Sequence, residues 1–267
     1  MAKIKASRVL ITGASSGIGK ATAFALAGRG AKLVLASRSF NRLEEVASQI
    51  KNAYPDLTKP LVVSCDVTNR RDVKRLIRST MDFFGGIDIL INNAGIGVYG
   101  ESDRTTIEDF RSVMEVNFFG AIQCMLEVLP VMKNAGKGLI VNIASVAAKH
   151  GIPYLGAYSA SKAALAALSQ SFRAELSKSG ISIMIVYPGY TQTDFFKKEK
   201  KVGGAHRPPE PYASVQNVAR AIIRAIENCR RDLILSLEGK ALALSQEMMP
   251  WIVEKAMEKT ANKLRDE

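Results

Sequence analysis

Short and nearly continuous apolar runs recur along the chain and constrain the fold more than any other feature. They lie at residues 8–11, 32–35, 60–63, 87–91, 139–143, 181–186 and 233–235. Strands buried on both faces of a parallel sheet have this character. Between them, helical periodicity covers residues 17–29, 41–53, 70–84, 105–133, 157–178 and 215–228. This alternation predicts βαβ units, and therefore a doubly wound α/β parallel sheet of about seven strands with helices on both faces.

The chain shows no repeat or linker that would divide it, so we expect one domain over residues 1–267. One stretch, residues 190–214, interrupts the alternation. It holds a lysine-rich run at 197–201, two adjacent glycines and three prolines. We expect neither a core helix nor a strand there, and loops of this length usually serve a function.

Composition excludes several classes of protein. The 267 residues are 47% hydrophobic and 23% charged, which is typical of a globular protein. A net charge of +12 permits nucleic-acid, membrane-surface or anionic small-molecule partners, but the charge is scattered and aromatics are only 7%, so we expect no nucleic-acid binding. Three cysteines without paired spacing and two histidines indicate reduced thiols and no metal site. We see no membrane-spanning window and no leader peptide, and expect a cytoplasmic location.

A glycine-rich turn follows the first expected strand and precedes the first helix. It reads Thr12-Gly-Ala-Ser-Ser-Gly-Ile-Gly19. Glycines let the backbone approach a phosphate, and the helix N-terminus supplies oriented N–H donors. A tight turn without a ligand is the alternative interpretation. The phosphate interpretation makes candidate cofactor contacts of Gly13, Ser15, Ser16, Gly17, Ile18 and Gly19.

The end of the second expected strand indicates which dinucleotide would bind. In dinucleotide-binding folds an acid at this position binds the ribose 2′-hydroxyl, whereas a base accommodates a 2′-phosphate. Ser37 and Arg38 stand there, and no acid does. Arg38 can form a charge-assisted pair with a phosphate. We therefore predict NADP(H) rather than NAD(H), the alternative being that Arg38 is only a surface charge.

Three further side chains suit hydride transfer to a carbonyl. Tyr158 and Lys162 are four residues apart and share one helix face. A nearby ammonium lowers the pKa of a tyrosine and makes it usable as an acid or base. Ser145 follows the fifth expected strand, at the carboxyl edge where doubly wound sheets bind ligands.

Together these features resemble the short-chain dehydrogenase/reductase family, whose fold is of the Rossmann type. The resemblance spans roughly residues 7–235. Its motifs are the glycine-rich turn, Asp66-Val67, Asn92-Asn93-Ala94-Gly95, Asn117, Ser145, Tyr158-x-x-x-Lys162 and Pro188-Gly189-x-Thr191.

The resemblance implies a role for each matched position. Tyr158 would be the general acid in reduction, Ser145 would hold the substrate oxygen, and Lys162 would bind the nicotinamide ribose. Asn117 would organise a proton-relay water. Further cofactor contacts would come from Ser37, Arg38, Asp66, Val67, Asn93, Ala94, Gly95, Tyr158, Lys162, Pro188, Gly189 and Thr191.

These roles predict an NADP(H)-dependent enzyme acting on a carbonyl or secondary alcohol. A 3-oxoacyl thioester, a keto lipid or a steroid-like ketone would fit a pocket with apolar walls. We expect those walls to include Ile96, Val98, Tyr99, Tyr154, Leu155, Tyr190, Phe195 and Phe196. The alternative function is a non-catalytic, NADPH-binding redox sensor or scaffold.

Two peripheral segments complete the expectations. By resemblance, residues 190–214 form a substrate lid, and Lys197 to Lys201 could meet an acyl carrier protein. A helical extension over residues 239–267 carries an apolar stripe that would pack on its own subunit or on a partner, with membrane-surface contact the less favoured alternative. The family's habit implies a homodimer or homotetramer formed through the helices that carry Asn117 and Tyr158.

Overall fold

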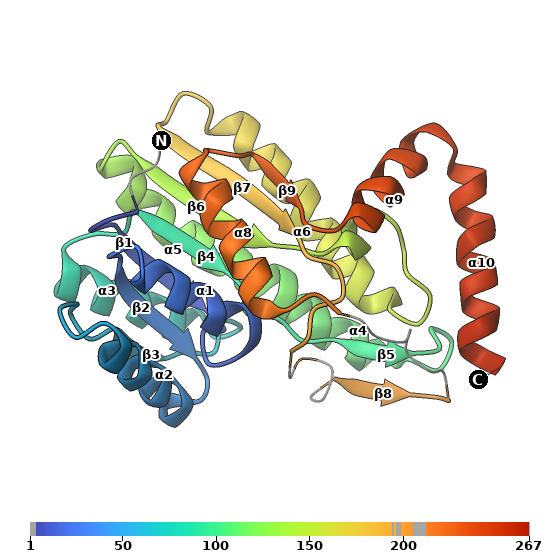
Figure 1. Ribbon diagram of the computed structural model, residues 1–267, viewed down its shortest axis with the longest axis horizontal. Helices are drawn as coiled ribbons and strands as arrows, with labels where there is room; N and C mark the ends of the chain where they lie inside the picture. Colours follow the sequence, from blue (N-terminus) through green and yellow to red (C-terminus); the bar gives the residue numbers. More distant parts are fainter. Residues whose placement is uncertain (1–3, 194, 196–198, 205–211, 267) are drawn as a thin grey trace.

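A seven-stranded parallel sheet forms the centre of the molecule (Figure 1). The computed structural model describes residues 4–193, 195, 199–204 and 212–266. The strand order is β3-β2-β1-β4-β6-β7-β9. The bounds are Arg8–Thr12 (β1), Lys32–Ser37 (β2), Leu61–Ser64 (β3), Ile89–Asn92 (β4), Gly138–Ile143 (β6), Ile181–Tyr187 (β7) and Asp232–Ile234 (β9). The predicted α/β fold class is confirmed.

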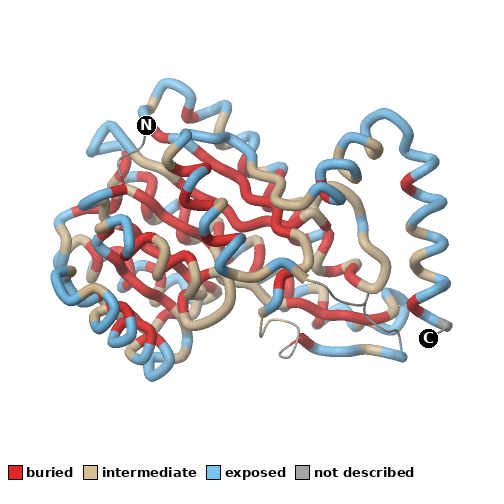
Figure 2. The backbone as a smooth tube through the Cα atoms, in the orientation of Figure 1, coloured by how far each residue is buried: buried red, intermediate tan, exposed pale blue. Residues whose placement is uncertain are grey.

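Helices cover both faces of this sheet because successive strand residues point to opposite sides. Val9 and Ile11 belong to one core cluster, which α1 (Gly17–Ala27), α2 (Phe40–Ala53) and α8 (Val215–Glu227) complete. Leu10 belongs to the opposite cluster, with α3 (Arg70–Phe84), α5 (Gly120–Asn134) and α6 (Gly156–Glu175). Figure 2 shows the strands as the buried centre of the molecule.

The helix expected over residues 105–133 is a composite of three pieces. It comprises α4 (Ile107–Met114), a π-helical turn (Glu115–Phe119) and α5. By length and composition alone, Ile107–Asn134 could cross a membrane, although Glu115 and Glu127 leave it no uncharged stretch of 18 residues. In this fold α5 packs against β4 and α3, which is the place of a core helix.

A small second sheet is the main departure from the expected architecture. β5 (Val98–Gly100) pairs in parallel with β8 (Lys200–Val202), to one side of the large sheet. The expectation that residues 190–214 contain no strand is therefore wrong at Lys200–Val202. A strand of three residues carries too short a pattern to be recognised in sequence.

The C-terminal extension forms two helices that project from the body (Figure 1). They are α9 (Leu237–Met248) and α10 (Pro250–Asp266), and Pro250 opens the second as expected. Contact with the body is limited: Val253 and Leu264 are buried, and the Tyr154 hydroxyl donates to the Ala261 carbonyl at 2.8 Å.

Candidate active site

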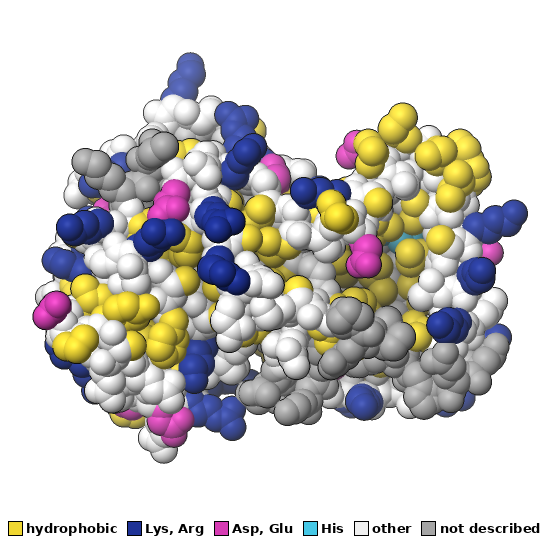
Figure 3. Space-filling view, in the orientation of Figure 1, with side chains coloured by type: hydrophobic (Ala, Val, Ile, Leu, Met, Phe, Trp, Pro, Cys, Tyr) yellow, Lys and Arg dark blue, Asp and Glu magenta, His cyan; other side chains and the backbone are white. Residues whose placement is uncertain are grey.

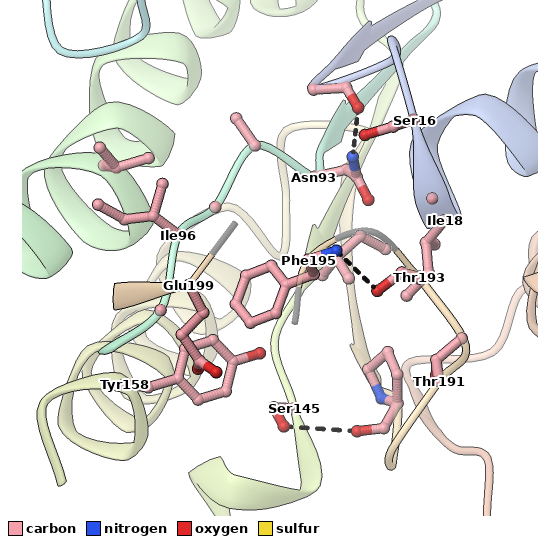
Figure 4. Close-up of a pocket in the computed structure, with 18 of the residues that line it drawn as sticks. Ser16, Ile18, Asn93, Ile96, Ser145, Tyr158, Thr191, Thr193, Phe195 and Glu199 are labelled. Carbon is pink, nitrogen blue, oxygen red and sulfur yellow. Dashed lines mark hydrogen bonds between the residues drawn. The ribbon is translucent and has the colours of Figure 1, made fainter. Parts of the chain in front are cut away.

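A cavity of about 520 Å³ opens at the carboxyl ends of β1, β2, β4, β6 and β7. Its lining begins at the turn after β1, passes the end of β2 and reaches the first turns of α6. Figure 4 shows its central part, where residues that follow β1, β4, β6 and β7 surround one space together with Tyr158 of α6. Doubly wound sheets bind their ligands at this edge, because the loops diverge there and leave a crevice.

The turn after β1 has the features of a phosphate-binding turn. Gly13 and Gly17 have φ angles of +65° and +55°, a region that side chains rarely enter. Ser16 caps α1, yet its hydroxyl makes no capping hydrogen bond. The first amides of α1 therefore lack a side-chain acceptor and are suited to an anion, as are the hydroxyls of Ser15 and Ser16 on the cavity wall. The residues present fit a dinucleotide phosphate.

Gly19 supports the turn instead of lining the cavity. It is buried, and a Cβ on it would lie 2.4 Å from the Asn93 amide nitrogen and 2.5 Å from the Gly13 carbonyl. The Asn93 amide donates to the carbonyls of Thr12 and Gly13 at 3.0 and 3.1 Å. Gly19 therefore has a packing role in the turn, and its expected cofactor contact stays a prediction.

The end of β2 gathers positive charge at the far end of the cavity. Ser37 and Arg38 line it as expected, and Arg42 in the first turn of α2 lines it too. Sequence reasoning missed Arg42, although its i+4 spacing from Arg38 was a usable signal. Asp66 and Val67 lie on the wall nearby, with the Asp66 carboxylate accepting from the Thr68 amide and hydroxyl.

Ser145 and Tyr158 meet at the opposite end. Ser145 follows β6, and its hydroxyl accepts from the Ala147 amide at 3.2 Å and donates to the Pro188 carbonyl at 3.4 Å. Burial raises the pKa of Tyr158 to about 12, while hydrogen bonding to Ser145 opposes the rise. The phenol is therefore protonated at neutral pH.

Lys162 places a buried ammonium one turn beyond Tyr158. Its Nζ donates to the Ile143 carbonyl at 2.8 Å and lies 5.8 Å from the centre of the Tyr158 ring. Burial lowers the pKa of Lys162 to about 8, because the charged form loses hydration. At neutral pH it still carries a positive charge, which favours ionisation of the phenol.

Asn117 lies behind the cavity wall. Its side chain accepts from the Ile96 amide at 2.8 Å and donates to the Ile96 carbonyl and to the Ser161 hydroxyl, each at 2.9 Å. The π-helical turn places it there, and such turns are frequent at functional sites. Its side chain thus holds the Gly95–Gly97 strip in place, and the expected relay through Asn117 stays a prediction.

Described residues of the segment after β7 line the cavity. Pro188, Gly189 and Thr191 line it, as do Asn93, Ala94 and Gly95 from the β4 side. Thr191 pairs with Ala213, which ties the two ends of the 190–214 segment together. Farther along, the Phe195 ring packs edge-on against Tyr158 with centroids 5.6 Å apart.

The apolar wall is only partly as expected. Ile96, Leu155, Tyr190 and Phe195 line the cavity, joined by Val146 and Ile152, which sequence reasoning missed. Val98, Tyr99 and Tyr154 do not line it and pack elsewhere, and Phe196 lies outside the described residues. Glu199 also lines the cavity and was not expected there.

A family model for short chain dehydrogenases matches residues 7–202. The chain belongs to the short-chain dehydrogenase family. This short-chain dehydrogenase is 33% identical to a dehydrogenase/reductase SDR family protein 7-like from Anopheles gambiae. The alignment covers 94% of this chain and 83% of that relative. It is also 34% identical to the ketoacyl reductase HetN from a Nostoc species, and that alignment covers 93% of this chain and 85% of HetN.

Solved structures of the family share this architecture. A short-chain dehydrogenase/reductase from Burkholderia phymatum, in complex with NAD, aligns over 94% of this chain and 96% of its own, with 25% identity and a TM-score of 0.86. A short-chain dehydrogenase from Burkholderia cenocepacia, in complex with NADP, aligns over 96% of this chain and 98% of its own, with 26% identity and a TM-score of 0.82. This oxidoreductase family thus includes members with either nicotinamide cofactor.

Proposed function

We propose that this short-chain dehydrogenase transfers a hydride between NADP(H) and a ketone or secondary alcohol on a largely apolar substrate. The observation that carries the cofactor choice is the pair Arg38 and Arg42 on the cavity wall at the end of β2, where no acidic side chain follows the strand. Two guanidinium groups suit a 2′-phosphate, whereas a 2′-hydroxyl needs neither.

The other end of the cavity supports carbonyl chemistry. When bound, the nicotinamide supplies or accepts the hydride. The Ser145 hydroxyl is placed to donate to the substrate oxygen, and the protonated Tyr158 phenol can deliver the proton that reduction requires. Lys162 stabilises the phenolate left behind, because its ammonium is buried beside the ring and little water screens it.

The substrate class follows from the walls around Tyr158. Ile96, Val146, Ile152 and Leu155 give this end an apolar lining, which suits a 3-oxoacyl thioester, a keto lipid or a steroid-like ketone. The relative named ketoacyl reductase favours the first. Contact with an acyl carrier would rest on Lys201, since Lys200 is paired with Asp109 and Lys197 and Lys198 lie outside the described residues.

The assembly and location form part of the same proposal. Phe119 and Leu126 are exposed apolar residues on the helix that carries Asn117, and they suit a homodimer or homotetramer interface. The three cysteines are free thiols, as in proteins of the reducing cytoplasm.

Cofactor consumption with matched variants tests the proposal. NADPH and NADH would be followed in parallel over a 3-oxoacyl thioester, a long-chain ketone and a steroid ketone. We expect preference for NADPH, and a fall in kcat/KM for NADPH of about tenfold or more in Arg38→Asp, because a charge-assisted contact is lost and a repulsion is added. Arg78→Asp, at an exposed position on α3, is the control. Unchanged preference in Arg38→Asp would refute the NADP(H) assignment, and binding of NADPH without any turnover would favour a sensor.

A further inference from the structure

Glu199 is an acidic side chain in the wall of the substrate end of the cavity. Only 8% of the residue is exposed, and it lines the cavity together with Phe195 and Tyr158. In Figure 4 its carboxylate lies on the same side of the cavity as the Tyr158 ring. Among the described residues of that lining, Asp66 is the other acid, and it lies at the far end beside Val67.

Contacts around Gly97 place this carboxylate close to the reacting phenol. A Cβ on Gly97 would lie 2.6 Å from a Glu199 carboxylate oxygen and 2.8 Å from the tip of the Phe195 ring. Both groups are thus seated against the backbone of the same glycine. Since the Phe195 ring also packs against the Tyr158 ring, Glu199, Phe195 and Tyr158 belong to the same part of the cavity wall.

Regular structure holds Glu199 in this position. The next residue, Lys200, opens β8 and pairs with Val98 of β5. The Lys200 ammonium donates to both carboxylate oxygens of Asp109 at 2.9 and 2.8 Å, and Asp109 is itself buried. Glu199 therefore directly precedes a paired strand whose first residue is anchored by an ion pair.

Charge in an otherwise apolar wall has a chemical consequence. A carboxylate accepts hydrogen bonds at two oxygens with about four lone-pair positions, so it has room for a ligand beside protein partners. Apolar walls alone distinguish ligands weakly, whereas a carboxylate in the wall adds a hydrogen bond to those ligands that carry a donor at this place. A second anion at this place would be repelled, with little water to screen it.

We propose that Glu199 is a specificity-determining residue that selects carbonyl substrates with a hydrogen-bond donor, a hydroxyl or an ammonium group, close to the reacting carbon. It discriminates against substrates with a carboxylate there. This inference rests on the proposed reductase function and narrows its substrate class, because neutral hydroxylated ketones and thioesters remain acceptable while free 3-oxo acids do not.

Four phenyl ketones test this selection. Acetophenone is the parent, α-hydroxyacetophenone and α-aminoacetophenone carry a donor beside the carbonyl, and benzoylacetate carries a carboxylate. The readout is kcat/KM of each relative to acetophenone, at slightly acidic pH so that the amine is protonated. Comparing these ratios between wild type, Glu199→Gln and Glu199→Leu cancels the intrinsic reactivity of each ketone. Glu258→Gln, an exposed acid on α10, is the matched control.

The expected ratios separate the two kinds of donor. In Glu199→Leu, preference for both donor-bearing ketones falls by about tenfold or more, and the relative rate with benzoylacetate rises. In Glu199→Gln, preference for the hydroxyketone is largely rescued by the amide oxygen, whereas preference for the aminoketone is lost with the charge. Ratios that stay equal in wild type and Glu199→Leu would overturn the inference.

A binding measurement distinguishes failure of the inference from failure of the proposed function. Ligand-observed NMR would compare 2-phenylethylamine with ethylbenzene on wild type and Glu199→Leu. Absence of turnover with all four ketones, together with amine binding that needs Glu199, overturns the reductase function and supports recognition by Glu199. Turnover without any Glu199-dependent preference, in rate or binding, supports the reductase function and overturns recognition by Glu199.

Discussion

At the residue scale, the active site depends on two neighbouring groups whose pKa values move away from each other. Tyr158 and Lys162 have ordinary pKa values near 10 and 10.4. Burial raises the pKa of the phenol to about 12 and lowers that of the ammonium to about 8, since each loses hydration of its charged form. Neutral pH therefore finds a protonated phenol beside a cation, which is the state that carbonyl reduction requires.

The two reaction directions should consequently differ in their pH dependence. Reduction uses the phenol, so its kcat/KM is highest where Tyr158 is protonated and falls as pH rises. Alcohol oxidation uses the phenolate, so its kcat/KM rises with pH. Lys162→Met removes the cation, raises the phenol pKa further and shifts the oxidation profile to higher pH. Steady-state profiles in both directions measure these shifts.

Tyr158→Phe tests directly whether the Tyr158 hydroxyl transfers the proton. Loss of the acid should lower turnover about 100-fold or more in both directions. Nucleotide titration checks that the cofactor cleft of the variant is intact. Turnover within tenfold of the wild type would mean that another group transfers the proton.

Site residues could be predicted from the sequence where their neighbours in the chain determine their position. Tyr158 and Lys162 share a helix face by spacing alone, and Ser145 follows directly from a strand end. Glu199 was missed because its place in the cavity depends on β8 pairing with β5, about 100 residues earlier in the chain. Nothing in the sequence around Lys197 to Lys201 distinguishes that buried carboxylate from a solvated run of charges.

At the scale of elements, the large sheet was predictable because its strands carry continuous apolar runs. β5 and β8 are three residues each and lack such a run. The π-helical turn was also missed, since it leaves the helical periodicity of residues 105–133 almost undisturbed. Both features determine details of the substrate end of the cavity, while the cofactor end is built from elements that the sequence pattern predicts well.

The ion pair between Lys200 and Asp109 should stabilise this small sheet. Because the Lys200 ammonium donates to the Asp109 carboxylate, the pKa of Asp109 lies below its ordinary value. A carboxyl whose pKa is lowered by folding stabilises the protein above its ordinary pKa, near 3.9, and loses that contribution as pH falls through the lowered value. Lys200→Met should therefore lower the free energy of unfolding by about 0.5–1 kcal/mol near neutral pH, a modest value because Lys200 is half-exposed.

Urea unfolding at several pH values measures this contribution. The difference between wild type and Lys200→Met should persist down to about pH 4 and narrow below it, because protonated Asp109 no longer attracts the ammonium. Lys201→Met, at the exposed neighbouring position on β8, should show no such pattern. A difference that is equal at all pH values would assign the effect to packing.

At the scale of the whole molecule, apolar side chains stay exposed where α9 meets α10. Figure 3 shows them gathered over that corner, and they include Leu244, Met248, Met249, Trp251 and Ile252. Single exposed apolar residues are common on monomers, whereas contiguous patches mark interaction sites. The two helices bear both acids and bases, so charge does not favour an anionic membrane over a protein surface. We therefore test the expectation that these apolar side chains pack on a subunit partner.

Trp251 reports on that expectation directly, since it is the only tryptophan in the chain and is 63% exposed in the single subunit. We expect its emission to shift to the blue as protein concentration rises and a second copy covers it. Trp251→Glu should lower the mass of the assembly in analytical ultracentrifugation, because a charge would be buried in an apolar contact. Leu126→Glu tests the α5 face in the same way, and Phe83→Glu, on α3, is the control. A mass unchanged in Trp251→Glu, with emission that shifts only when vesicles are added, would assign the corner to a membrane surface instead.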